Sequence, residues 1–229
     1  MLEHGLVNAS PASVRAVHVG SVAPLGPHGT LSAFRKHPVA YPVVAHELGL
    51  AGDAQADLKV HGGRDKAVYA YPLSRYAAWA LEFPELSDRL VAGSMGENLP
   101  VEGVDENEIH IGDRVRVGGA LLQVSQPRIP CFKLGLAFDE PRLIRAMIRN
   151  GYCGWYYRVV ESGAIGAGDA HVVVERPNPE WTIARFAGII AARAMGAEVL
   201  SEIVAMEGLA ANWQTRALRQ LAELRHVVL

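Results

Sequence analysis

The sequence is poor in the features that mark secreted, membrane-spanning and nucleic-acid-binding proteins. Two cysteines in 229 residues are too few for a secreted disulfide framework, so we expect a reducing, cytoplasmic location. The opening MLEHGLVNASPAS lacks the cationic start and apolar core of an export signal, and no apolar run approaches membrane-spanning length. A formal net charge of -2 without a dense basic run argues against nucleic acid as a partner.

What the chain does contain suits a folded globular protein of mixed type. Half of its residues are apolar and a fifth are charged, and its length can bury a proper core. Period-two patterning dominates up to Arg176-Pro177, and helical patterning follows from Thr182. We therefore predict a mainly β (α+β) fold in three parts: a flexible N-terminus at 1–13, a β body with peripheral helices at 14–176, and a three-helix unit at 181–229.

The same periodicities place individual elements along the chain. They predict strands at 14–20, 41–48, 67–71, 109–113, 114–117, 121–125, 155–161 and 171–175. Within the body they predict helices at 74–83 and 84–90, and a helix capped by Asp139 that carries Pro141 in its first turn and ends at Gly151. In the tail they predict helices at 183–195, 197–206 and 212–225.

The stretch Gln126-Pro127-Arg128-Ile129-Pro130-Cys131 leaves a predicted strand and is stiffened by two prolines. Arg128 and Cys131 are therefore carried on a loop with little freedom. A guanidinium near a thiol favours the thiolate, which attacks electrophiles and binds soft metals. The alternative is that Cys131 is a small buried residue that only fills space. Cys153 has no such frame and is interpreted as a packing cysteine.

Other polar residues allow a site interpretation and a structural one. Gly62-Gly63 can bring backbone amides close to an anion, or can make a tight turn between strands. His61 can bind a metal or hold a structural hydrogen bond. Glu97 and Asn98 are either polar turn residues or part of a site, and the segment at 30–38 is by itself a solvated turn.

Six stretches of the chain, in the same order, resemble the MOSC domain family, including its stand-alone bacterial members with a helical appendage. They cover most of residues 14 to 175 and are GLAGDAQAD at 49–57, VHGGRDKAVYAYP at 60–72, MGENL at 95–99, IGD at 111–113, LQVSQPRIPCFKL at 122–134 and GWYYRV at 154–159. The resemblance implies a MOSC-type β-barrel body, a C-terminal helical subdomain and binding of molybdenum cofactor.

By position in the motif, the resemblance makes Cys131 the residue that ligates molybdenum, as a soft thiolate would. It implies a catalytic set of Cys131, Asp65 and Asn98. Its implied cofactor-binding residues supply cations, amides and hydrogen bonds to the phosphate and pterin, and are Ser32, Lys36, His61, Gly62, Gly63, Glu97, Asn98 and Arg128. Family members commonly have a small residue other than cysteine where Cys153 stands, so a second thiol near the site stays open.

The function that the resemblance implies is a molybdenum-dependent reductase of small N-hydroxylated compounds such as hydroxylaminopurines. The sequence has no flavin or iron–sulfur motif, so we expect a separate electron-donor protein. One alternative is a cofactor or sulfur carrier with a persulfide on Cys131, and another is a non-catalytic small-molecule binding barrel. The apolar faces of the helical tail also suggest a homodimer.

Overall fold

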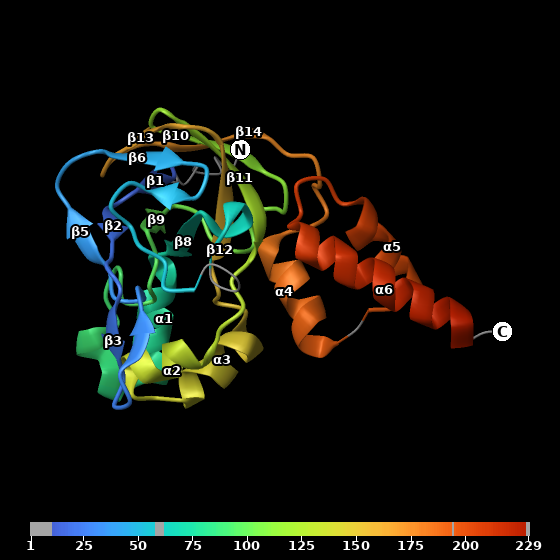
Figure 1. Ribbon diagram of the computed structural model, residues 1–229, viewed down its shortest axis with the longest axis horizontal. Helices are drawn as coiled ribbons and strands as arrows, with labels where there is room; N and C mark the ends of the chain where they lie inside the picture. The colour runs from blue at the N-terminus through green and yellow to red at the C-terminus, as the bar shows by residue number, and fades with distance from the viewer. Residues whose placement is uncertain (1–10, 58–61, 194, 228–229) are drawn as a thin grey trace, which may run out of the picture.

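The computed structural model describes residues 11–57, 62–193 and 195–227 and shows a β-rich body with three helices on one side (Figure 1). One sheet of seven strands forms the body, in the spatial order β1-β9-β8-β12-β11-β10-β14. These strands span Ser13–Val14 (β1), Leu99–Glu102 (β9), Val68–Pro72 (β8), Trp155–Glu161 (β12), Ala120–Pro127 (β11), Arg114–Val117 (β10) and His171–Glu175 (β14).

The two edge strands of this sheet approach each other, so the sheet is nearly closed. Ser13 of β1 forms an antiparallel bridge with Ala170, which precedes β14, and the His171 amide donates to the Ala12 carbonyl at 2.8 Å. All pairings in the sheet are antiparallel except that of β8 with β9. The expected mainly β, barrel-like architecture is confirmed.

Smaller sheets and short helices surround this barrel. The strands of the smaller sheets are β13 (Gly163–Ile165) with β6 (Val43–His46) and β7 (Gly49–Leu50), β2 (Val17–Val19) with β5 (His37–Val39), and β3 (Ala23–Leu25) with β4 (Thr30–Ser32). The helices beside the barrel are η1 (Arg64–Lys66), α1 (Ser74–Glu82), η2 (Pro84–Arg89), α2 (Phe132–Phe138) and α3 (Arg142–Asn150).

The chain ends in three helices, α4 (Ile183–Ala192), α5 (Ala197–Ala205) and α6 (Ala211–Val227). Helix α4 packs against β11 and α3, and α5 and α6 pack on each other farther from the barrel (Figure 1). The Thr182 hydroxyl caps α4 by accepting a hydrogen bond from the Arg185 amide. No helix in the described part of the chain is long and apolar enough to cross a membrane.

Strand β11 lies at the centre of the fold, and all eight of its residues are buried. Its buried polar groups have partners: the Gln126 side-chain oxygen accepts a hydrogen bond from the Trp213 indole at 3.0 Å, which ties β11 to α6. The neighbouring strand β12 places the buried side chains of Trp155 and Tyr157 beside it, paired with Pro127 and Val124. The loop that follows β11 therefore starts from a fixed end.

The structure corrects several expected elements. The predicted strand at 109–113 is a turn, in which the His110 amide donates to the Asp113 carboxylate at 3.0 Å, although a bridge joins His110 to Thr182. Asp139 does not cap α3; it ends the unpredicted helix α2 with a left-handed φ of 52°. Ser13 belongs to β1 rather than to a loose end, and residues 1–10 lie outside the described residues.

Candidate functional site

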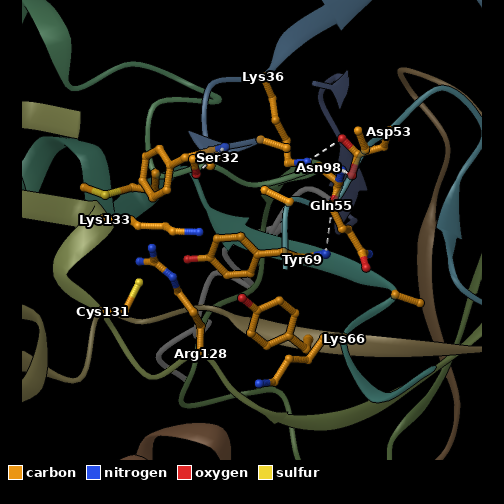
Figure 2. Close-up of a pocket in the computed structure, with 18 of the residues that line it drawn as sticks. Ser32, Lys36, Asp53, Gln55, Lys66, Tyr69, Asn98, Arg128, Cys131 and Lys133 are labelled. Atoms are coloured by element: carbon orange, nitrogen blue, oxygen red, sulfur yellow. Dashed lines mark hydrogen bonds and ion pairs between the residues drawn. The ribbon is translucent and has the colours of Figure 1, made fainter. Parts of the chain in front are cut away.

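A pocket opens where β11 ends, between the 128–131 loop and the segment around Lys36 (Figure 2). Strands β4 and β8, the loops at 53–56 and 95–98, and the start of α2 complete its wall. Its polar and aromatic lining residues are Ser32, Phe34, Lys36, Asp53, Gln55, Lys66, Tyr69, Asn98, Arg128, Cys131, Lys133 and Tyr156. Four lysine or arginine side chains face it against one carboxylate, so the pocket favours anions.

Cys131 is a free, half-buried thiol at the entry to α2. Pro127 ends β11, and Pro130 immediately precedes the cysteine, so both fix the loop that carries it. Figure 2 shows its sulfur on the same side of the pocket as the Arg128 guanidinium and the Lys133 ammonium. The proline-framed loop thus presents a thiol to a cationic pocket, as the sequence suggested.

Arg128 is buried, with only 5% of its surface exposed, and its guanidinium packs over two aromatic rings. It lies 5.3 Å from the Tyr69 ring centre and 5.6 Å from that of Phe34, and it donates to the Met147 sulfur at 3.3 Å. Burial alone would lower its pKa, but Tyr69, Tyr156 and Cys131 raise it overall. No carboxylate within the described ranges forms an ion pair with Arg128, so an external anion can pair with this cation.

Lys36 is also buried, but the protein supplies its counterion. Its ammonium pairs with Asp53, and the two side chains are 8% and 3% exposed. Asp53 also accepts hydrogen bonds from the Gly20 amide at 2.8 Å and the Asn98 side chain at 2.9 Å. Burial lowers the pKa of Lys36, and the attraction of Asp53 opposes this effect only in part.

Sequence reasoning missed two cations of the pocket, Lys66 and Lys133. Lys133 follows Cys131 by two residues in α2 and is 8% exposed. Lys66 ends η1, and burial lowers its pKa against the opposing effects of Asp57 and Asp65. Their closeness in sequence to Cys131 and to Gly63 was the signal that could have identified them.

The structure brings five of the expected site residues together in this pocket: Ser32, Lys36, Asn98, Arg128 and Cys131. The Asn98 side chain is fully engaged, because it donates to Asp53 and to the His18 carbonyl and accepts from the Tyr69 amide at 3.1 Å. The Asn98 side chain therefore links β8 to the loop that carries Asp53.

Glu97 is buried and is not among the residues that line the pocket, although its neighbour Asn98 is. Its fully buried carboxylate accepts hydrogen bonds from the Tyr76 hydroxyl and the Gly93 amide, both at 2.6 Å. Burial raises its pKa more than these hydrogen bonds lower it. Its contacts in this structure are those of a core residue.

The segment at 61–65 contributes less to the pocket than expected. Asp65 does not line it; its carboxylate accepts hydrogen bonds from Arg158 at 2.6 Å and from the Ala211 amide at 3.3 Å, and so joins the barrel to α6. Gly62 and Gly63 are not among the lining residues, and His61 lies outside the described residues.

Cys153 lies outside the Cys131 pocket and lines a second cavity. It is 3% exposed, and burial raises the pKa of its thiol, so the thiol is neutral. Its carbonyl accepts a hydrogen bond from the Tyr69 hydroxyl at 2.9 Å. Among residues 11–57, 62–193 and 195–227, no group of three or more His, Cys, Asp or Glu side chains is arranged to hold a metal ion.

Comparison with known proteins agrees with the sequence resemblance. The model of the MOSC domain matches residues 57–172. The chain belongs to the MOSC family. It is 38% identical to protein YiiM of Escherichia coli over 194 residues, which cover 85% of this chain and 86% of YiiM. MOSC domains in general are associated with binding of molybdenum cofactor.

Further relatives extend this comparison to a longer enzyme and to solved structures. A protein named reductase from Gibberella moniliformis is 37% identical over 172 residues, which cover 75% of this MOSC chain but 30% of that protein. The crystal structure of YiiM from Geobacillus stearothermophilus superposes with a TM-score of 0.77 at 31% identity, covering 92% of this chain and all of that one. Escherichia coli YiiM gives 0.76 at 30% identity, with 93% and 92% covered.

Proposed function

We propose that this MOSC protein is a molybdenum-cofactor-dependent reductase of N-hydroxylated compounds such as hydroxylaminopurines. The observation that carries the proposal is the single thiol of Cys131 in a pocket rich in buried cations. Membership of the MOSC family and the reductase-named relative support the same class of chemistry.

The residues of the pocket fit the charge and softness of that cofactor. Cys131 offers a soft sulfur ligand, suited to a metal that already carries the two sulfurs of a pterin dithiolene. Arg128, Lys66 and Lys133 would balance the negative charge of its phosphate, with Arg128 as the bidentate partner. When bound, the cofactor would supply a redox-active metal centre.

Reduction of an N-hydroxylated base replaces its N–OH group by N–H. The reaction consumes two electrons and two protons and releases one water molecule. The chain can contribute to the proton side of this reaction. Tyr156 lines the pocket, and burial raises the pKa of its phenol despite the opposing effect of Arg128, so the phenol keeps its proton at neutral pH. It can donate a hydrogen bond to a substrate oxygen. The electrons would come from a separate donor protein.

Two cysteine variants test this proposal, with reduction of hydroxylaminopurine by an artificial electron donor as the assay. Cys131→Ser should abolish activity, because a neutral hydroxyl is a poor replacement for a soft thiolate. Cys153→Ser, the matched control, should keep most activity and at most lose some stability from a hydroxyl in an apolar site. Full activity of the Cys131 variant would contradict the metal-ligand role.

A further inference from the structure

A second cavity lies between the 128–130 loop, α3 and α4, the first helix of the tail. Its walls are mainly apolar and include Ile129, Pro130, Met147, Ile148 and Ile190. Arg128 and Ile129 line this cavity and also the Cys131 pocket. The two spaces therefore meet at the buried guanidinium.

The charges around this cavity favour an anion. Its lining includes Arg128 and Arg193, and no aspartate or glutamate in the described part of the chain is among the lining residues. The Nη1 atom of Arg128 donates to the Met147 sulfur at 3.3 Å, and a thioether is a weak acceptor that an anionic oxygen would replace favourably. Cys153 adds no negative charge, because burial keeps its thiol protonated.

The apolar walls and the cation together define the kind of ligand. Small-molecule sites are commonly apolar clefts with a few placed polar groups that fix orientation. We propose that this cavity binds the apolar part of an aromatic, acidic substrate whose carboxylate takes the place of the Met147 sulfur at Nη1 of Arg128, while the rest of the guanidinium faces the cofactor phosphate in the Cys131 pocket. Helix α4 is then part of the substrate site, and the helical tail selects substrates. The identification of this ligand as the substrate rests on the proposed reductase function. The proposal that the cavity binds such a ligand does not depend on that function.

Two neighbouring alanines of α4 allow a matched test. Both are exposed, and of the two Ala191 alone lines the cavity. The probe is naphthoate, an aromatic carboxylate, with naphthylmethanol as its uncharged counterpart, titrated calorimetrically into the full-length protein. We expect Ala191→Trp to fill the mouth of the cavity and weaken naphthoate binding at least about tenfold, and Ala192→Trp to leave the affinity unchanged. Naphthylmethanol should bind about tenfold more weakly than naphthoate, because it lacks the charge-assisted contact.

Equal naphthoate affinity in the Ala191→Trp variant and the parent, or equal affinity for the two probes, would overturn the proposal. In the reductase assay, naphthoate should inhibit the parent and Ala192→Trp competitively, and inhibit Ala191→Trp at least about tenfold less. Naphthoate that binds in the cavity without competing would overturn the assignment of the ligand as substrate. Absence of reductase activity with cavity binding intact would instead contradict the proposed function, so the two failures are distinguishable.

Discussion

Lys36 and Arg128 are buried cations of the same pocket, but they are neutralised in different ways. Lys36 has Asp53 as a counterion, and Asp53 is itself held by Gly20 and Asn98. Arg128 has aromatic rings and a thioether around it. Lys36 is therefore bound into the protein's own network, whereas Arg128 is the better candidate for contact with an anionic cofactor.

Removing the Lys36 charge should destabilise the fold, because it leaves Asp53 buried and unpaired. We expect Lys36→Met to lower the free energy of unfolding by about 3–5 kcal/mol, measured by urea denaturation. The double variant Lys36→Met/Asp53→Asn should recover part of this loss, since it removes the unpaired charge. A single variant as stable as the parent would show that the ion pair has no structural role.

Glu97 should make stability depend on pH in a defined direction. Its pKa in the folded protein lies above the usual glutamate value of about 4.3, so folding favours the protonated form. The resulting stabilisation is complete below that usual value and is lost as the pH rises through the raised pKa. Urea denaturation across this range should show the parent losing stability relative to Glu97→Gln, by about 1.4 kcal/mol for each unit of the shift. A constant difference between the two proteins at all pH values would contradict this.

At the residue scale, the sequence was informative where a local feature marked the position. The two prolines around Arg128 and Cys131 identified a rigid loop, and the structure places both residues in the pocket. Lys66 and Lys133 lie close in sequence to Gly63 and Cys131 but were missed, because a lysine by itself does not show whether it faces a pocket or solvent. Asp65 was expected in the pocket, but its direction depends on α6, which is distant in sequence.

Among the elements, the turn between α3 and β12 supports the pocket loop, because the Arg128 amide donates to the Gly154 carbonyl at 3.3 Å. Gly151 and Gly154 both have left-handed backbone, with φ of 70° and 62°. A Cβ at Gly154 would collide with the Ala70 carbonyl oxygen of β8, whereas one at Gly151 meets no atom within 4 Å. An alanine at Gly151 would therefore introduce backbone strain alone, whereas one at Gly154 would add a steric clash.

We expect Gly151→Ala to cost about 1–2 kcal/mol of unfolding free energy, the usual penalty for left-handed backbone. Gly154→Ala should cost about 1–3 kcal/mol more, because β8 and β12 must move apart. Thermal denaturation of the two variants under the same conditions measures the difference. Equal losses would mean that the contact with β8 is not a close one.

Long periodic elements were predictable from the sequence and short ones were not. Strand β12, helix α1 and the three tail helices lie close to their expected positions. Helix α2 has only seven residues and includes Gly135, where an added Cβ would lie 3.2 Å from the Pro141 Cα atom. Tertiary packing rather than helix propensity therefore determines that α2 forms. The turn at 109–113 alternates like a strand, but the Asp113 carboxylate accepts the His110 amide and closes it.

For the whole molecule, Asp65 contributes one of the contacts between the barrel and its helical tail. Replacing Asp65 by Ala should loosen this contact, because the Ala211 amide loses its acceptor and Arg158 keeps only its bonds to Gln123 and the Leu209 carbonyl. Hydrogen exchange should accelerate in the first turn of α6. Glu161→Ala is the control, since it removes an exposed ion pair with Arg116 elsewhere on the barrel. Loss of reductase activity with unchanged exchange would instead assign Asp65 to catalysis.

The central claim for the whole molecule is that the Cys131 pocket holds molybdenum cofactor. Elemental analysis of the protein purified from a host that makes the cofactor tests it most directly, with Cys131→Ser and Cys153→Ser analysed alongside. We expect equimolar molybdenum in the parent and in Cys153→Ser, and reduced molybdenum in Cys131→Ser. A parent protein without molybdenum that carries sulfane sulfur on Cys131 would contradict it and indicate a sulfur carrier.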